Sequence, residues 1–308
     1  MKVNQIIKSM GLVALCFAAV ACNKSQNEPD QPTTPTDSTE TPVDSIVKPI
    51  VKSGEFSVSD STIVLFAPGN LEYQASTKTY RFAANQYDTI GNGNANISDS
   101  YDGWIDLFGW GTGANPTLCI GEGDTTDYET FYAEYVDWGT NKIDDYEANT
   151  WRTLSNDEWN YVLFTRTNAA KLHGGATVNG VKGWVILPDA WVAPEGITFN
   201  PSVENGLEVT SYDPNYYYNS KGDSFEHNVY TAEEWAKLED AGAIFLPMTG
   251  SRFKNNYNCY DYNGTYWSSS EYADYTAFKY CFAFDASNLS TTMNDGSNGY
   301  AVRLVKNK

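Results

Sequence analysis

The sequence predicts an α+β fold in which runs of short strands surround two separate helices. Alternating apolar residues have the period of half-buried strands, both after Ser53 and at the end of the chain over Tyr300–Val305. Two helix-start motifs of the capping-box type occur, at Ser155 and at Thr231. An apolar run ending in Leu-Pro follows each motif. This pattern is typical of a strand that ends at the proline, because proline has no N–H to donate to a neighbouring strand.

The N-terminus has the organisation of an export signal. Two lysines precede the apolar stretch Gly11–Ala21, which is too short to span a membrane, so we interpret residues 1–21 as a signal peptide. Cys22 directly follows small residues, an arrangement that resembles the lipobox of bacterial lipoproteins. This resemblance implies a lipidated Cys22 as the mature N-terminus, anchored to the bacterial outer membrane. The alternatives are a cleaved signal followed by a chance cysteine, or an uncleaved anchor.

Residues 22–53 are predicted to be a disordered tether. They are rich in proline, threonine, serine and acidic residues and contain no aromatic residue, so they cannot bury enough surface to offset the entropy of ordering. Proline-rich spacers are extended and semi-rigid. The tether would hold the domain formed by residues 54–308 away from a membrane surface.

The first part of that domain is predicted to be β-rich. Strands are expected at Phe56–Ser59 and Ile63–Phe66, followed by a hairpin with Leu71–Tyr73 on one strand and Tyr80–Phe82 on the other. The glycine- and asparagine-rich stretch Gly91–Gly113 follows. Its large apolar side chains are expected to fill the core from a long loop, and a surface shelf for a sugar is the alternative; they are Trp104, Leu107, Phe108 and Trp110.

Each predicted helix begins with the pattern S/T-x-x-E-W. After Ser155, one helical face carries Trp159, Val162, Leu163 and Arg166. After Thr231, the apolar face carries Trp235 and Leu238, and Gly242 is placed to end the helix in the left-handed conformation. The strands that follow are predicted at Val185–Pro188 and Ile244–Pro247.

Several of these segments together resemble a known family. The segments Trp151–Trp159, Tyr266–Ser270 and Gly299–Val305, with the Leu-Pro strand ends, are similar to the Fibrobacter major-paralogous domain of bacterial surface lipoproteins. That domain is related to the C-type-lectin-like fold. The resemblance implies a C-type-lectin-like domain with two helices, small twisted antiparallel sheets and long loops, whose two ends meet in one sheet.

The C-terminal loops have the composition of a binding surface. Tyrosine supplies contact area at low entropic cost, while asparagine and serine supply adaptable hydrogen bonds. We therefore predict that ligand-binding side chains come from these loops: Asn256, Tyr257, Tyr260, Tyr262, Tyr272, Tyr275, Asn288 and Asn294. By contrast, Trp267 is expected to pack beneath the loops, and Arg303 to brace the sheet through a carboxylate.

Calcium is the one candidate cofactor. Asp285 and Asp295 offer the oxygen ligands that this ion prefers, and nearby asparagines could add more. Trp267 is followed by serines, where the sugar-binding C-type lectins have a Trp-Asn-Asp motif, which argues against calcium-dependent sugar binding. For an exported protein, Cys259 and Cys281 are the candidate disulfide pair.

No enzymatic activity is expected. Related formylglycine-generating enzymes need a close cysteine pair near the C-terminus, which this sequence lacks. The two histidines, His173 and His227, stand in glycine- or acid-flanked stretches without a second histidine at metal-ligand spacing, and we expect both on the surface. With a formal net charge of −19 and no basic cluster, the chain is not expected to bind nucleic acid.

These observations predict a surface-anchored lipoprotein that acts as an adhesin or lectin-like binding module for a glycan or protein ligand. The alternatives are a variable protein of a diversity-generating retroelement, since such proteins belong to the same superfamily, and a structural subunit of the cell envelope. Fold analogy alone does not choose between them, because function depends on the site.

Overall fold

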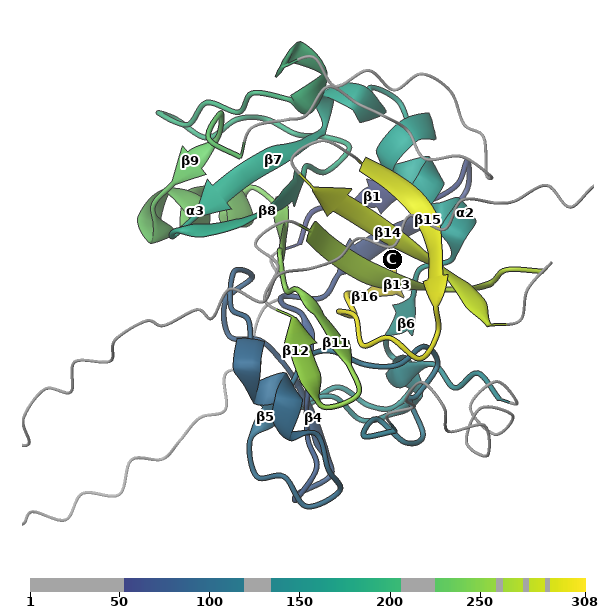
Figure 1. Cartoon of the computed structure of the whole chain (residues 1–308). Helices are drawn as coiled ribbons and strands as arrows, with labels where there is room; N and C mark the ends of the chain where they lie inside the picture. The colour runs from purple at the N-terminus through teal and green to yellow at the C-terminus, as the bar shows by residue number, and fades with distance from the viewer. Residues whose placement is uncertain (1–52, 119–133, 206–224, 259–262, 274–276, 286–288) are drawn as a thin grey trace, which may run out of the picture. The chain divides into compact units, whose positions relative to one another are not determined.

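The computed structural model describes residues 53–118, 134–205, 225–258, 263–273, 277–285 and 289–308 (Figure 1). Contacts divide the chain into Met1–Val47, which lies wholly outside the described residues, and Lys48–Lys308. The predicted signal peptide, Cys22 and the tether before Ser53 therefore stay predictions. Within the described ranges, no helix combines the length and the apolar character that a membrane span requires.

The described part of Lys48–Lys308 has the predicted mixed α+β architecture, with small, mostly antiparallel sheets. One sheet has the order β1–β2–β16–β6, with bounds Phe56–Ser57, Ile63–Phe66, Leu304–Asn307 and Arg152–Thr153. A second has the order β10–β8–β7–β9, with bounds Ile244–Pro247, Val181–Ile186, His173–Val178 and Val229–Tyr230. The pairing of β7 with β9 is parallel, and the other pairs in both sheets are antiparallel.

The remaining strands form two three-stranded sheets and a hairpin. The order β4–β3–β5 joins Thr79–Phe82, Leu71–Gln74 and Trp104–Ile105. The order β13–β14–β15 joins Asn263–Glu271, Phe278–Asp285 and Leu289–Asp295. The hairpin pairs β11 (Ser251–Phe253) with β12 (Asn256–Asn258). The predicted β2 strand and the predicted β3–β4 hairpin are confirmed, with Leu71 opposite Phe82 and Tyr73 opposite Tyr80.

Both predicted capping boxes are present. The Ser155 hydroxyl accepts from the Glu158 amide at 3.2 Å and begins α2 (Asn156–Asn160), which continues as a π-helical turn η3 (Tyr161–Thr165). The Thr231 hydroxyl accepts from the Glu234 amide at 3.2 Å and begins α3 (Ala232–Asp240). The short 3₁₀ segments are η1 (Gly91–Asn96), η2 (Trp138–Thr140), η4 (Ala169–Lys171) and η5 (Ser202–Asn205). Local hydrogen bonding therefore sets where α2 and α3 begin.

The two ends of the domain meet in one sheet, as the resemblance implied. In β16, Val305 pairs with Phe66 of β2 on one side and with Arg152 of β6 on the other. Gly242 has φ +95° after α3, as predicted, and a Cβ atom there would lie 2.6 Å from the Cα of Gly54. This glycine is needed both for the turn and for the close approach of the domain's first residues.

Large aromatic side chains fill the core. Trp138, Trp159, Trp184, Trp235 and Trp267 are all at least 98% buried. Leu107, Phe108 and Trp110 are also buried, which confirms that this long loop contributes to the core. Trp104 is different: it is half-buried, and the guanidinium carbon of Arg81 lies 3.7 Å from its ring centroid.

Two polar residues depart from expectation. Arg303 is 1% exposed and its guanidinium donates to amide and carbonyl oxygens rather than to a carboxylate. His173 was expected on the surface, but it lies in β7, is fully buried, and its Nε2 lies 3.1 Å from the carbonyl oxygen of Leu163. Burial lowers the pKa of His173 to about 3, so the ring is neutral. His227 is exposed, as expected.

Candidate functional site

The candidate site is one end of the β13–β14–β15 sheet, whose middle is buried on both faces. On one face Phe282 stacks on Trp159 of α2, with ring centroids 5.1 Å apart. On the other face, Trp267 and Cys281 belong to a second core cluster. Because a shift of one residue would exchange the two faces, this double burial fixes the register of the strands.

Toward the start of β14, the face that carries Phe282 becomes exposed. Phe278 is 42% exposed, and Tyr272, Tyr280 and Met293 are half-buried. The Tyr272 ring meets the Tyr280 ring edge-on with centroids 5.7 Å apart, and Met293 lies opposite Tyr280 in the sheet register. We call these four residues the aromatic end. They present apolar and aromatic surface on a backbone that the sheet holds in place.

The opposite face of the same end contains a buried lysine. The Lys279 side chain is 1% exposed, and its Nζ lies 3.2 Å from Glu271 Oε1 and 4.2 Å from the ring centroid of Trp110. The indole face attracts the ammonium group electrostatically. Trp110 is itself fixed, because its Nε1 donates to the carbonyl oxygen of Ser268 at 2.7 Å. The Glu271 side chain remains 55% exposed and places a carboxylate at this end of the sheet.

Two of the predicted ligand-binding residues, Tyr272 and Asn294, lie at this end. The Tyr272 amide donates to the carbonyl oxygen of Phe278 at 3.2 Å, and Asn294 pairs with Lys279 in register. They therefore flank the same stretch of β14, one from the β13 side and one from β15. The Asn294 amide nitrogen also donates to Cys281 Sγ at 3.3 Å, so part of its hydrogen-bonding capacity is used inside the fold.

Two further predicted residues, Asn256 and Tyr257, lie in β12. Asn256 is exposed, whereas the Tyr257 hydroxyl donates to the carbonyl oxygen of Thr249 at 3.2 Å and its ring packs against the main core. The other predicted ligand-binding residues lie outside the described residues: Tyr260, Tyr262, Tyr275 and Asn288.

The structure does not bring the two predicted calcium ligands together. Asp285 ends β14 and pairs with Asn263, whereas Asp295 ends β15 opposite Phe278, at the other end of β14. At ~3.3 Å per residue, the two positions are roughly 20 Å apart along the sheet. They do not share one ion, because the sheet register separates residues that the sequence places close together. Among the described residues, no group of three acidic, histidine or cysteine side chains could hold a metal ion.

Cys281 is a free and fully buried thiol in the structure. Burial raises its pKa to about 12, so it is not a reactive thiolate at neutral pH. Its predicted disulfide partner, Cys259, lies outside the described residues, and the pairing stays a prediction.

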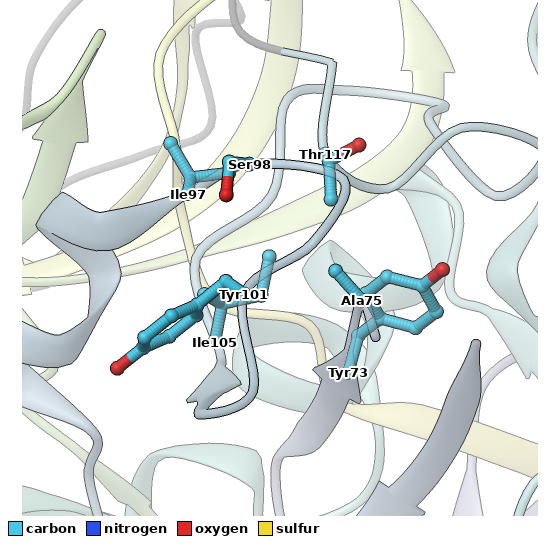
Figure 2. Close-up of a pocket in the computed structure, with 7 residues that line it drawn as sticks. All are labelled: Tyr73, Ala75, Ile97, Ser98, Tyr101, Ile105 and Thr117. Atoms are coloured by element: carbon cyan, nitrogen blue, oxygen red, sulfur yellow. The ribbon is translucent and has the colours of Figure 1, made fainter. Parts of the chain in front are cut away.

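A narrow crevice lies elsewhere, beside β3 and β5 (Figure 2). It encloses about 140 Å³ including its open mouth, and it is too narrow for a water molecule. Figure 2 shows its lining, which comes from β3, β5 and neighbouring loops: Tyr73, Ala75, Ile97, Ser98, Tyr101, Ile105 and Thr117. We assign no ligand to this space, because even a single sugar ring is larger than a water molecule.

Sequence reasoning missed Phe278, Tyr280 and Lys279 as members of the candidate site, although Met293 lies in a segment whose exposed residues were expected to bind. Phe278 and Tyr280 alternate with Phe282 and therefore have the pattern of core residues. This alternation predicts that the three side chains point to the same face of the sheet, but it does not predict how far along the strand that face is covered. Only the tertiary structure shows that Phe282 is buried against Trp159 of α2 whereas Phe278 extends beyond the core.

No family model matches the chain, and neither the curated proteins nor the solved structures include a match.

Proposed function

We propose that this protein is a lipid-anchored envelope protein whose C-type-lectin-like domain binds a glycan or protein ligand at the aromatic end. The observation that supports this function is the half-exposed group Tyr272, Phe278, Tyr280 and Met293 on an ordered sheet. Such an adhesin would be held to the bacterial outer membrane by lipidated Cys22 and kept away from the surface by residues 22–53.

The physical argument rests on preorganisation. Tyr272 and Tyr280 contact each other, and their strands are held by a core that is buried on both faces. Little further entropy is lost when a ligand covers rings that are already fixed, so more of the contact energy contributes to affinity. Such an aromatic surface suits the apolar face of a sugar or an apolar side chain.

The first test is an array of glycans and proteins probed with the full chain, in calcium and again with a chelator. We expect binding that survives the chelator, because Asp285 and Asp295 lie at opposite ends of β14. Loss of binding with the chelator would instead indicate a metal-dependent site, and no binding in either condition would contradict the proposed function.

Two variants locate the site on any ligand that the array identifies. Phe278→Ala and Tyr272→Ala should each weaken binding about tenfold, the loss expected on removing roughly 1.4 kcal/mol of ring contact. Val192→Ala is the matched control, because Val192 is a 77% exposed apolar residue outside the β13–β15 sheet. If all three variants bind the ligand with equal affinity, the aromatic end is not the binding site.

The anchor is tested separately. Cys22→Ser should move the protein from the membrane fraction to the soluble fraction and remove the lipid mass from its N-terminal peptide. A protein that stays in the membrane fraction without Cys22 would contradict the predicted anchor and leave the binding proposal untouched.

A further inference from the structure

The two edge strands of the β13–β15 sheet differ in whether other backbone segments bond to their outer side. The outer edge of β13 is covered, because the Trp267 amide donates to the carbonyl oxygen of Ala301 at 3.0 Å and the Ser269 amide donates to that of Leu154 at 2.8 Å. Figure 1 shows β15 on the other side of the sheet, where β14 is its only strand neighbour among the described strands and α2 lies beside it, with the Thr291 hydroxyl donating to Asn160 Oδ1 at 2.8 Å. In the described ranges, no backbone hydrogen bond reaches Leu289–Asn294 from any strand besides β14.

The exposed part of this edge is Thr291–Asp295. Leu289 and Ser290 are buried, whereas each of the next five residues is half-buried. In an antiparallel pair, successive residues alternately point their N–H and C=O groups toward and away from the partner strand. About half of the backbone groups in Thr291–Asn294 therefore point outward, over a length of roughly 14 Å, and the Asp295 carbonyl oxygen beyond them accepts from the Asn298 amide at 3.1 Å.

This edge lacks the features that usually protect a strand from pairing. Protected edges are short, bulged, or carry proline or lysine. β15 has the sequence LSTTMND, contains neither proline nor lysine, and pairs with β14 without a register shift over its whole length. Its threonines favour the extended conformation. An edge of this kind is ready to accept another strand.

The surroundings of the edge indicate what kind of strand fits. Asp295 ends β15, where its Oδ1 accepts from the amide and hydroxyl of Ser297 at 2.9 and 2.8 Å, and its carboxylate places a negative charge at this end of the edge. The chain as a whole has a formal net charge of −19. A strand with a basic residue beside Asp295 is attracted, whereas a second copy of this chain is repelled. On the face of the aromatic end, Met293 offers an apolar neighbour to a β-branched side chain of the incoming strand.

We propose that the Thr291–Asp295 edge of β15 binds an extended segment of a partner protein by β-strand addition, with a basic residue of that segment beside Asp295. This inference rests on the proposed binding function and names the ligand class as protein. Backbone hydrogen bonds to the open edge supply affinity, while Met293 and Asp295 select an uncharged, β-branched segment with a basic end. The chain's own residues 23–52 fit poorly, because they carry many acids and prolines.

The experiment measures binding of a fluorescent peptide to the full chain by anisotropy. The probe alternates threonine and valine and has a lysine at each end. One control peptide replaces both lysines with glutamates, and another carries a proline at its centre. We expect the lysine-ended peptide to bind and each control to bind at least about tenfold more weakly. No binding of the lysine-ended peptide, or equal binding of the glutamate-ended one, would overturn the proposal.

Paired proline variants test the edge itself. Thr291 and Thr292 are neighbours, so the amide of one bonds to β14 and the amide of the other points outward. Of Thr291→Pro and Thr292→Pro, one should lose stability, and the other should stay folded yet bind the peptide about tenfold more weakly. Val229→Pro is the matched control, because Val229 is a 62% exposed edge residue of another sheet. Unchanged binding by the stable proline variant would refute the proposal.

Hydrogen exchange of the unmodified chain gives an independent measurement. The outward amides of Thr291–Asp295 should exchange at least about tenfold more slowly with the peptide bound, and unchanged exchange would contradict strand addition. Self-association through β15 without peptide binding would replace the proposed partner with a second copy. A glycan ligand from the array together with failure of the peptide would refute this inference alone, whereas failure of both would also refute the proposed function.

Discussion

Removing the Arg303 guanidinium should destabilise the fold more than removing any surface charge. Its Nε, Nη1 and Nη2 atoms donate over 2.8 to 3.3 Å to two side-chain amide oxygens and two carbonyl oxygens, those of Asn70, Gln86, Ala67 and Phe245. Burial lowers the pKa of Arg303 to about 10, so desolvation offsets part of this gain. Arg303→Ala leaves three buried acceptors without the guanidinium, while Gln86 Oε1 still accepts from the Phe245 amide at 2.7 Å, and we expect a loss of about 4 kcal/mol in the free energy of unfolding.

Equilibrium unfolding in urea measures this loss. Arg303→Lys keeps the charge but not the fork of donors, so we expect an intermediate loss of about 2 kcal/mol. The matched control is Arg152→Ala, because the Arg152 side chain is 32% exposed and pairs with Glu158 at 2.6 Å at the surface. That variant should lose about 1 kcal/mol or less. A loss below about 1 kcal/mol for Arg303→Ala would refute the argument from buried acceptors.

Three further predictions concern stability. Burial raises the pKa of Asp106 to about 6, so its protonated side chain stabilises the fold below pH 3.8, and about 3 kcal/mol of this stabilisation is lost as the pH rises to 6. Because His173 gives the stability the opposite pH dependence between pH 3 and 6.5, the free energy of unfolding of Asp106→Asn should be compared with that of the unmodified chain between pH 4 and 6. Identical pH dependence of the two proteins would contradict this prediction. Thr231→Ala should cost about 1 kcal/mol in urea unfolding, and a neutral result would show that packing alone defines the start of α3. Gly139→Ala should prevent normal folding, because the new Cβ would lie 1.9 Å from the carbonyl oxygen of Trp151; a native circular dichroism spectrum and parental melting temperature would contradict it.

The sequence by itself determined the elements whose causes are local. Ser155 and Thr231 begin the two helices because each capping box is closed within four residues, and these hydrogen bonds need no distant partner. The same holds for the β3–β4 hairpin and for Gly242, where the backbone needs a residue without a Cβ atom. The α+β class followed from the order of these elements.

The tertiary structure decided which side chains meet. Asp285 and Asp295 are close in sequence, yet the register of β14 and β15 sends them to opposite ends of the sheet. The polar context of His173 predicted exposure, but β7 carries it into the core. Arg303 finds its acceptors on segments far along the chain, and Phe278 is 42% exposed although Phe282, on the same face of β14, is buried against Trp159 of α2. The alternation of apolar residues along a strand predicts which face of the sheet a side chain points to. Which element packs over that side chain, and which residues it contacts, depend on long-range packing that no local pattern encodes.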